Sequence, residues 1–153
     1  MRILLVAALL LSAFIYLRPR PGYDLSDVPP EKANAIRIEK EGMAEIVLAK
    51  GRKGWEIEKP VRERANQGAV RNLLSLLEAK SDRKLDAGEI SRFGLDKPTL
   101  RIHIDREEFD FGMLNPVTGQ QYVRNGDWVY LISARYALVP SLLELEADHA
   151  GAS

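Results

Sequence analysis

The sequence predicts an α+β domain: a mainly antiparallel sheet with two amphipathic helices, preceded by one N-terminal transmembrane helix. Apolar and polar residues alternate over residues 100–105, which is the pattern of a strand with one wet face. A stripe with helical spacing is formed by Val70, Leu73, Leu74 and Leu77. No helix alternates with successive strands in the manner of a βαβ unit, so a parallel sheet is not expected.

The length and composition of the chain exclude several classes of partner and site. The chain has 153 residues, which is room for one domain and a short appendage. Its 22 lysines and arginines balance 22 aspartates and glutamates, so no nucleic-acid partner is predicted. The absence of cysteine excludes disulfides, thiolate metal sites and cysteine nucleophiles.

An uncharged apolar run extends from Ile3 to Leu17. As a helix it spans about 22 Å, and flanking Arg2 and Arg18 can snorkel to make up the difference from a bilayer core of about 30 Å. A cleaved signal peptide and a buried core helix are the alternatives. No small-x-small cleavage site follows the run, and nothing along it breaks the apolar surface. We predict an uncleaved signal anchor over residues 1–18, with the lipid bilayer as the partner of residues 3–17.

The segment 19–34 is rich in Pro, Gly and Asp, and each X-Pro step favours an extended backbone. It is therefore predicted to be a solvated stalk, with docking of Tyr23 and Leu25 on the domain as the alternative. The folded domain is expected over residues 35–146, and residues 147–153 are expected to be a disordered tail.

Three antiparallel strands are predicted before the first helix. Alternation around Ile36 and Ile46 indicates a hairpin, and a second turn at residues 51–54 leads into a strand that contains Trp55. Asn66 stands where its side-chain oxygen can cap the helix. Trp55 and Leu74 are predicted to be core residues rather than a binding site.

After that helix, both strands and short helical segments are expected. A short strand at 83–85, a single helical turn at 86–92 and a tight turn with positive φ at Gly94 precede the strand at residues 100–105. Phe109 and Phe111 continue one face on the return strand, and residues 135–145 form the second helical segment.

Asn125-Gly126 predicts a two-residue type I′ hairpin in which Arg124 faces Asp127. Both of its faces are apolar, one with Tyr122, Val129 and Leu131 and the other with Val123, Trp128, Tyr130 and Ile132. A hairpin with two apolar faces needs another part of a protein packed against each face. Either one helix lies on each face, or both lie on one face and the second set is a candidate partner surface.

No catalytic constellation is present, so the chain is predicted not to be an enzyme and to need no cofactor and no metal. His103 is expected to face solvent or pair with a neighbour. The carboxylates of Asp105, Glu107, Glu108 and Asp110 are interpreted as a solvated turn rather than a Ca²⁺ site.

An ordered set of short motifs resembles the 4340 family of domains of unknown function over about residues 35 to 145. The motifs are Trp55-Glu56-Ile57 with Pro60, Arg64-Ala65-Asn66 before Val70 and Leu73-Leu74, Phe93-Gly94-Leu95-Asp96 with Pro98, Phe111-Gly112, Tyr122-Val123-Arg124 and Val129-Tyr130-Leu131. Two features depart from the pattern: Asn66 stands where the family usually has Asp, and this chain carries one copy of a unit often seen in pairs.

The resemblance implies a bacterial, exported, membrane-tethered domain, and it supplies no catalytic residues. Some members occur with gliding-motility or ABC-type transport components. Arg18 and Arg20 oppose export by the positive-inside rule, so the periplasmic, inner-membrane location rests on the resemblance. We expect a non-enzymatic interaction module that contacts an unidentified membrane or envelope protein; the alternative is a ligand-binding accessory domain of a transport or gliding system.

Overall fold

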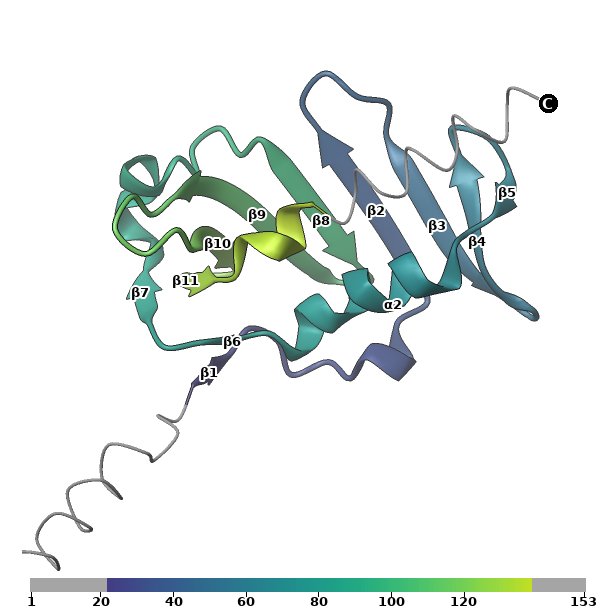
Figure 1. Cartoon of the computed structure of the whole chain (residues 1–153), viewed down its shortest axis with the longest axis horizontal. Coiled ribbons are helices and arrows are strands. Elements are labelled where there is room, and N and C mark those ends of the chain that lie inside the picture. Colours follow the sequence, from purple (N-terminus) through teal and green to yellow (C-terminus); the bar gives the residue numbers. More distant parts are fainter. Residues whose placement is uncertain (1–21, 139–153) are drawn as a thin grey trace, which may run out of the picture.

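The structure is a computed structural model, and it describes residues 22–138 (Figure 1). A nine-stranded sheet contains β2 (Ala35–Lys40), β3 (Ile46–Gly51), β4 (Gly54–Lys59), β5 (Glu63–Arg64), β7 (Lys84–Asp86), β8 (Leu100–Ile104), β9 (Glu107–Leu114), β10 (Gln121–Asn125) and β11 (Trp128–Ile132). A two-stranded sheet pairs β1 (Tyr23–Asp24) with β6 (Lys80–Ser81). The helical elements are η1 (Pro30–Lys32), α2 (Gln67–Leu74), η2 (Ser75–Glu78), η3 (Ala87–Phe93) and η4 (Ala134–Ala137).

The strand order in the large sheet is β5-β4-β3-β2-β8-β9-β10-β11-β7. Two antiparallel meanders, β2 to β5 and β8 to β11, join where β2 pairs with β8. Every strand pairing among the described residues is antiparallel, which confirms the predicted α+β class. The predicted transmembrane run and tail lie outside the described residues. No helix within residues 22–138 is long and apolar enough to cross a bilayer.

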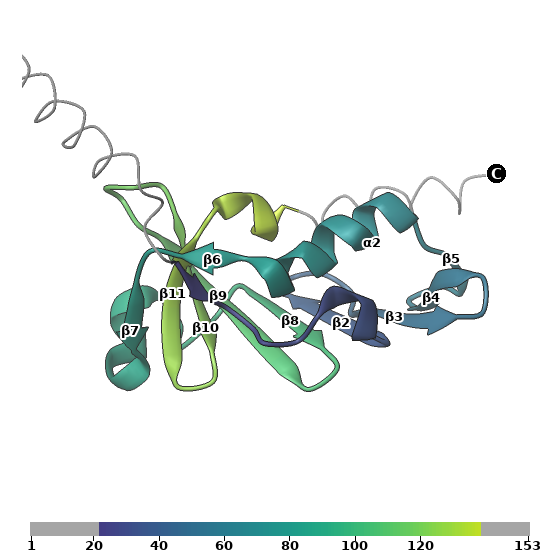
Figure 2. The same ribbon diagram turned by 90° about the horizontal axis from the view of Figure 1, so that it is seen from below.

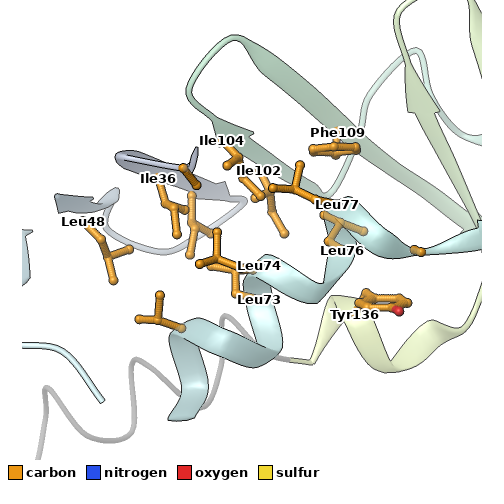
Figure 3. Close-up of a cluster of buried hydrophobic side chains, with 14 of the residues drawn as sticks. Ile36, Leu48, Leu73, Leu74, Leu76, Leu77, Ile102, Ile104, Phe109 and Tyr136 are labelled. Carbon is orange, nitrogen blue, oxygen red and sulfur yellow. The ribbon is translucent and has the colours of Figure 1, made fainter. Parts of the chain in front are cut away.

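The helix α2 covers one side of the sheet, with η2 continuing it as a 3₁₀ turn (Figure 2). Asn66 caps α2 as predicted, because its Oδ1 accepts hydrogen bonds from the N–H groups of Gly68 and Ala69. The predicted apolar stripe is buried: Val70, Leu73, Leu74 and Leu77. Figure 3 shows the leucines of α2 and η2 facing the isoleucines of β2 and β8 and the ring of Phe109. Burial of Trp55 and Leu74 confirms them as core residues.

The N-terminal segment departs from the sequence prediction. Residues 22–34, expected to be a solvated stalk, are part of the domain: Leu25 and Ala33 are buried. The Leu25 N–H donates to the carbonyl of Ala79, and Asp105 accepts from the N–H groups of Asn34 and Ala35. The extended backbone that prolines favour suits this packing, because it lets the segment pair with β6. Docking, the alternative interpretation, is therefore correct for Leu25, whereas the side chain of Tyr23 stays 50% exposed although its backbone pairs with β6.

The β10–β11 hairpin forms in a different register from the predicted one. Asn125 pairs with Trp128, so the loop is Gly126-Asp127, and Arg124 faces Val129 instead of Asp127. Within this two-residue loop positive φ occurs at Gly126 and not at Asp127, and a type II′ turn needs glycine at this first loop position. The side-chain amide of Asn125 points away from the turn: its Nδ2 donates hydrogen bonds to the Leu25 carbonyl and to the Glu107 carboxylate. The cross-strand partner of each residue is shifted by two positions from the predicted one. Because side chains alternate with a period of two, each residue stays on its predicted face of the sheet.

Both faces of this hairpin are covered. On one face, α2, η2 and η4 pack over a buried cluster that includes Val123, Tyr130 and Ile132. On the other face Val129 and Leu131 are buried, and the ring of Phe93, at the end of η3, lies 4.8 Å from the ring of Tyr122. The second cover is thus the η3 segment, not a second helix. The predicted helix at residues 135–145 is described only as far as η4 and Leu138.

Candidate functional surface

The candidate partner surface predicted on the hairpin is not an exposed patch. Val123, Tyr130 and Ile132 are 0%, 5% and 1% exposed and belong to the core. Only Trp128 remains accessible, at 41%, with the Lys84 ammonium 4.3 Å from its ring centroid. The prediction was wrong because it counted two helices as the only covers. It overlooked the η3 segment, which lies over the face that carries Tyr122.

The opposite side of the sheet from α2 carries two chains of ion pairs, which His103 joins into one row. It crosses from the end of β4 to β10 and contains, in spatial order, Lys59, Glu45, Arg37, Glu39, His103, Glu108, Arg101, Asp110 and Arg124. We call these nine side chains the charge row. Strand alternation produces it, because Ile36, Ile38 and Ile102 point into the core and their neighbours in sequence point outward.

Asp110 is the buried member of the charge row. Its side chain is 1% exposed and accepts hydrogen bonds from the guanidinium groups of Arg101 and Arg124, the second at 2.6 Å. The hydrogen bond with Asp110 raises the pKa of Arg101 above its ordinary value, while burial opposes the rise. A buried carboxylate needs such partners, since an unpaired one is costly to desolvate.

His103 lies in the middle of the charge row. Its Nε2 is 3.3 Å from an Arg37 nitrogen and 3.5 Å from Glu39, and its Nδ1 is 3.5 Å from Glu108. The prediction that His103 pairs with a neighbour is therefore confirmed.

The acidic residues near the β8–β9 turn do not converge. Asp105 accepts from backbone N–H groups, Glu107 accepts from Asn125, and Asp110 binds two arginines. Within residues 22–138 no three potential ligands gather into a group that suits a metal ion. Sequence reasoning placed Asp110 in a solvated turn. The signal that corrects this is register, because the β8–β9 hairpin pairs Asp110 with Arg101.

Two open depressions lie near these features. One, of about 490 Å³, adjoins the charge row and is lined by Glu39, Lys40, Glu41, Lys97, Pro98 and Arg101. The other, of about 450 Å³, lies on the helix side, where Trp55 and Leu74 form an apolar floor beside Lys50, Arg71 and Glu78. The charge row presents mutually paired polar and charged side chains on an open surface, an arrangement suited to recognition.

Replacing Asp110 by alanine is expected to lower the free energy of unfolding by about 2 to 3 kcal/mol, because two guanidinium groups lose their shared carboxylate. The loss falls below that of a fully buried pair, since Arg101 and Arg124 are 34% and 29% exposed and water solvates them in part. Urea unfolding of the full chain in detergent, followed by circular dichroism, measures the change. His103→Ala is the control and should cost less than about 1 kcal/mol. Equal midpoints for the two variants would show that Asp110 is not a structural centre.

A family model described as a domain of unknown function (DUF4340) matches residues 55–147. The matched range begins in β4, so β1, η1, β2 and β3 precede it, although β2 is the strand that joins the two halves of the sheet. No curated protein and no solved structure matches the chain.

Proposed function

The chain belongs to the DUF4340 family of domains of unknown function, and from that premise we propose that it is a membrane-anchored, non-enzymatic interaction module of a bacterial envelope assembly. The uncharged run from Ile3 to Leu17 supports the anchor. We place the domain on the periplasmic side of the inner membrane, and an unidentified membrane or envelope protein is its partner.

The charge row is the observation that carries this proposal. Arg37, Glu39 and Glu108 keep between 40% and 48% of their side-chain surface exposed, so the row is open to a partner. Its charges are already held by one another, so a partner would bind them with little further loss of side-chain entropy. Alternating charges favour one docking register over others, because like charges are brought together in a wrong register.

A ligand-binding accessory domain of a transport or gliding system is the second candidate. The depression floored by Trp55 and Leu74 favours it, because an apolar lining with a few charged groups around it is typical of small-molecule sites.

The test is site-specific photocrosslinking of the full chain in native membranes that have been washed with alkaline carbonate. The chain should stay in the pellet. A photoreactive residue in place of Glu108 should then crosslink to one envelope protein, and Glu39→Lys should abolish that product. The control is the same photoreactive residue in place of Asn72, on the exposed side of α2.

Release of the chain by carbonate would refute the anchor. Equal products from both positions, or none from position 108, would refute the charge row as the docking surface. A product from a photoreactive residue in place of Arg71, which lines the other depression, would favour the second candidate.

A further inference from the structure

One end of the sheet gathers the β9–β10 loop, the end of β11, β6 and the first described residue. Gln121 pairs with both Leu114 and Ile132, so the end of β9, the start of β10 and the end of β11 lie together. The Ser81 hydroxyl accepts from the Leu131 N–H at 3.0 Å, which brings β6 to the same end. A Cβ on Gly22 would lie 3.1 Å from Lys80, so the first described residue is there too. Figure 2 shows β1, β6 and β11 meeting at this place.

The chain is directed toward this end as it is followed back to its N-terminus. The Leu25 carbonyl accepts from Asn125 at the opposite end, beside the β10–β11 tip. Two residues earlier, Tyr23 lies opposite Ser81 and therefore near Leu131. Gly22, the first described residue, thus lies at the end of the sheet that carries the β9–β10 loop. We call it the anchor-proximal end.

The length of the connection limits the distance to the bilayer. The apolar run ends at Leu17, and five residues, 18–22, join it to β1. Fully extended, they span at most about 17 Å. The headgroup layer on one side of a bilayer takes about 5 to 7 Å of that distance. An anchored chain therefore keeps its anchor-proximal end close to the lipid surface.

The β9–β10 loop, at this end of the sheet, exposes the apolar side chain of Val117 to solvent. The Asn115 carboxamide oxygen accepts from the N–H groups of Val117 and Thr118, and the backbone of Asn115 bonds Gly119 and Gln120. The loop is thus organised around Asn115, and the Val117 side chain is 90% exposed at its apex.

Two more apolar side chains are exposed at this end of the sheet. Leu114 is 53% exposed at the end of β9, and Tyr23, a residue type enriched at membrane interfaces, is 50% exposed beside β6. Asp82 and Arg83 are both exposed in the turn after β6. Their opposite charges sum to zero. Apolar contact rather than net charge distinguishes this end.

We propose that the anchor-proximal end is a membrane-contacting surface: Val117, Leu114 and Tyr23 enter the headgroup region of the bilayer that holds the anchor. This inference rests on the anchor in the proposed function. The contact fixes the domain with its sheet end on the lipid and leaves the charge row facing sideways, available to a neighbouring protein.

The test uses the full chain, which has no native cysteine. Single cysteines at Val117 and, as a control, at Asp127 receive an environment-sensitive fluorophore, and the chain is reconstituted into phosphatidylethanolamine–phosphatidylglycerol vesicles. Asp127 lies in the β10–β11 loop, about 17 Å further along the strands. Lipids with a nitroxide on the headgroup should quench the Val117→Cys label at least twofold more than the Asp127→Cys label. A water-soluble quencher should show the reverse order.

A third label, on Ser12→Cys, reports on the anchor through lipids with a nitroxide on the acyl chain. Quenching at position 12 with equal values at 117 and 127 would overturn the membrane-contacting surface and leave the anchor in place. No quenching at position 12 would overturn both. To check that apolar contact is responsible, Leu114→Ser and Tyr23→Ser together should at least halve the headgroup quenching at position 117; unchanged quenching would contradict the proposal.

Discussion

Replacing Gly112 by alanine is expected to lower the free energy of unfolding by about 3 to 5 kcal/mol. A Cβ at this position would overlap the carbonyl oxygen of Phe93 and lie 3.0 Å from the Leu95 side chain. Backbone cannot rotate away as the end of a flexible side chain can, so the segment after η3 must lift from β9. The cost combines overpacking with exposure of Leu95, which is 2% exposed in the native chain.

The measurement is urea unfolding of the full chain in detergent, with Gly126→Ala as the matched control. Gly126 has φ of +57° and nothing within 4 Å of the added Cβ, so its replacement costs only backbone strain, about 1 kcal/mol. Gly112 has no positive φ, so its replacement isolates the steric effect. A Gly112→Ala variant as stable as Gly126→Ala would mean that the η3 segment does not cover the sheet.

Replacing Trp55 by alanine should cost about 3 to 5 kcal/mol, because the indole is 7% exposed in the core between β4 and α2. The backbone around it is also fixed: the Gln67 side chain accepts from the Trp55 N–H and donates to its carbonyl, at 3.0 and 2.9 Å. Loss of the indole therefore leaves a cavity, because this backbone cannot collapse into the space.

The chain supplies its own control, since it has two tryptophans. Trp128→Ala removes a ring that is 41% exposed and contacts Lys84, and it should cost about 1 kcal/mol. The two unfolding midpoints, compared under identical conditions, decide the assignment. An unchanged midpoint for Trp55→Ala would mean that the strand from Gly54 to Lys59 is not part of the core sheet.

The two substitutions probe opposite sides of the sheet. Trp55 belongs to the α2 side, whereas Gly112 allows the close approach of residues 93–95 on the other side. Near β11 and the end of β9 the sheet has cover on both faces, and elsewhere from β4 to β10 the outer face carries the charge row instead. A partner surface is therefore to be sought where the second cover ends.

The sequence by itself determined the elements that local chemistry specifies. The period-two alternation around Ile36 and Leu100, the helical stripe that includes Leu73 and the Asn66 cap each depend on residues within a few positions of one another. The faces of the β10–β11 hairpin were also fixed, because alternation survives a shift of two residues.

Only the tertiary structure decided which surfaces meet. The β2–β8 pairing, the docking of Leu25 and the burial of Asp110 each join residues from different elements, and alternation along one strand does not say which element covers it. Tyr130 and Trp128 show the difference, since both lie on the same predicted face. Tyr130 is in the core, and Trp128 is left exposed at the hairpin tip. Burial is set by what packs against a side chain, and those contacts come from segments far away in the sequence.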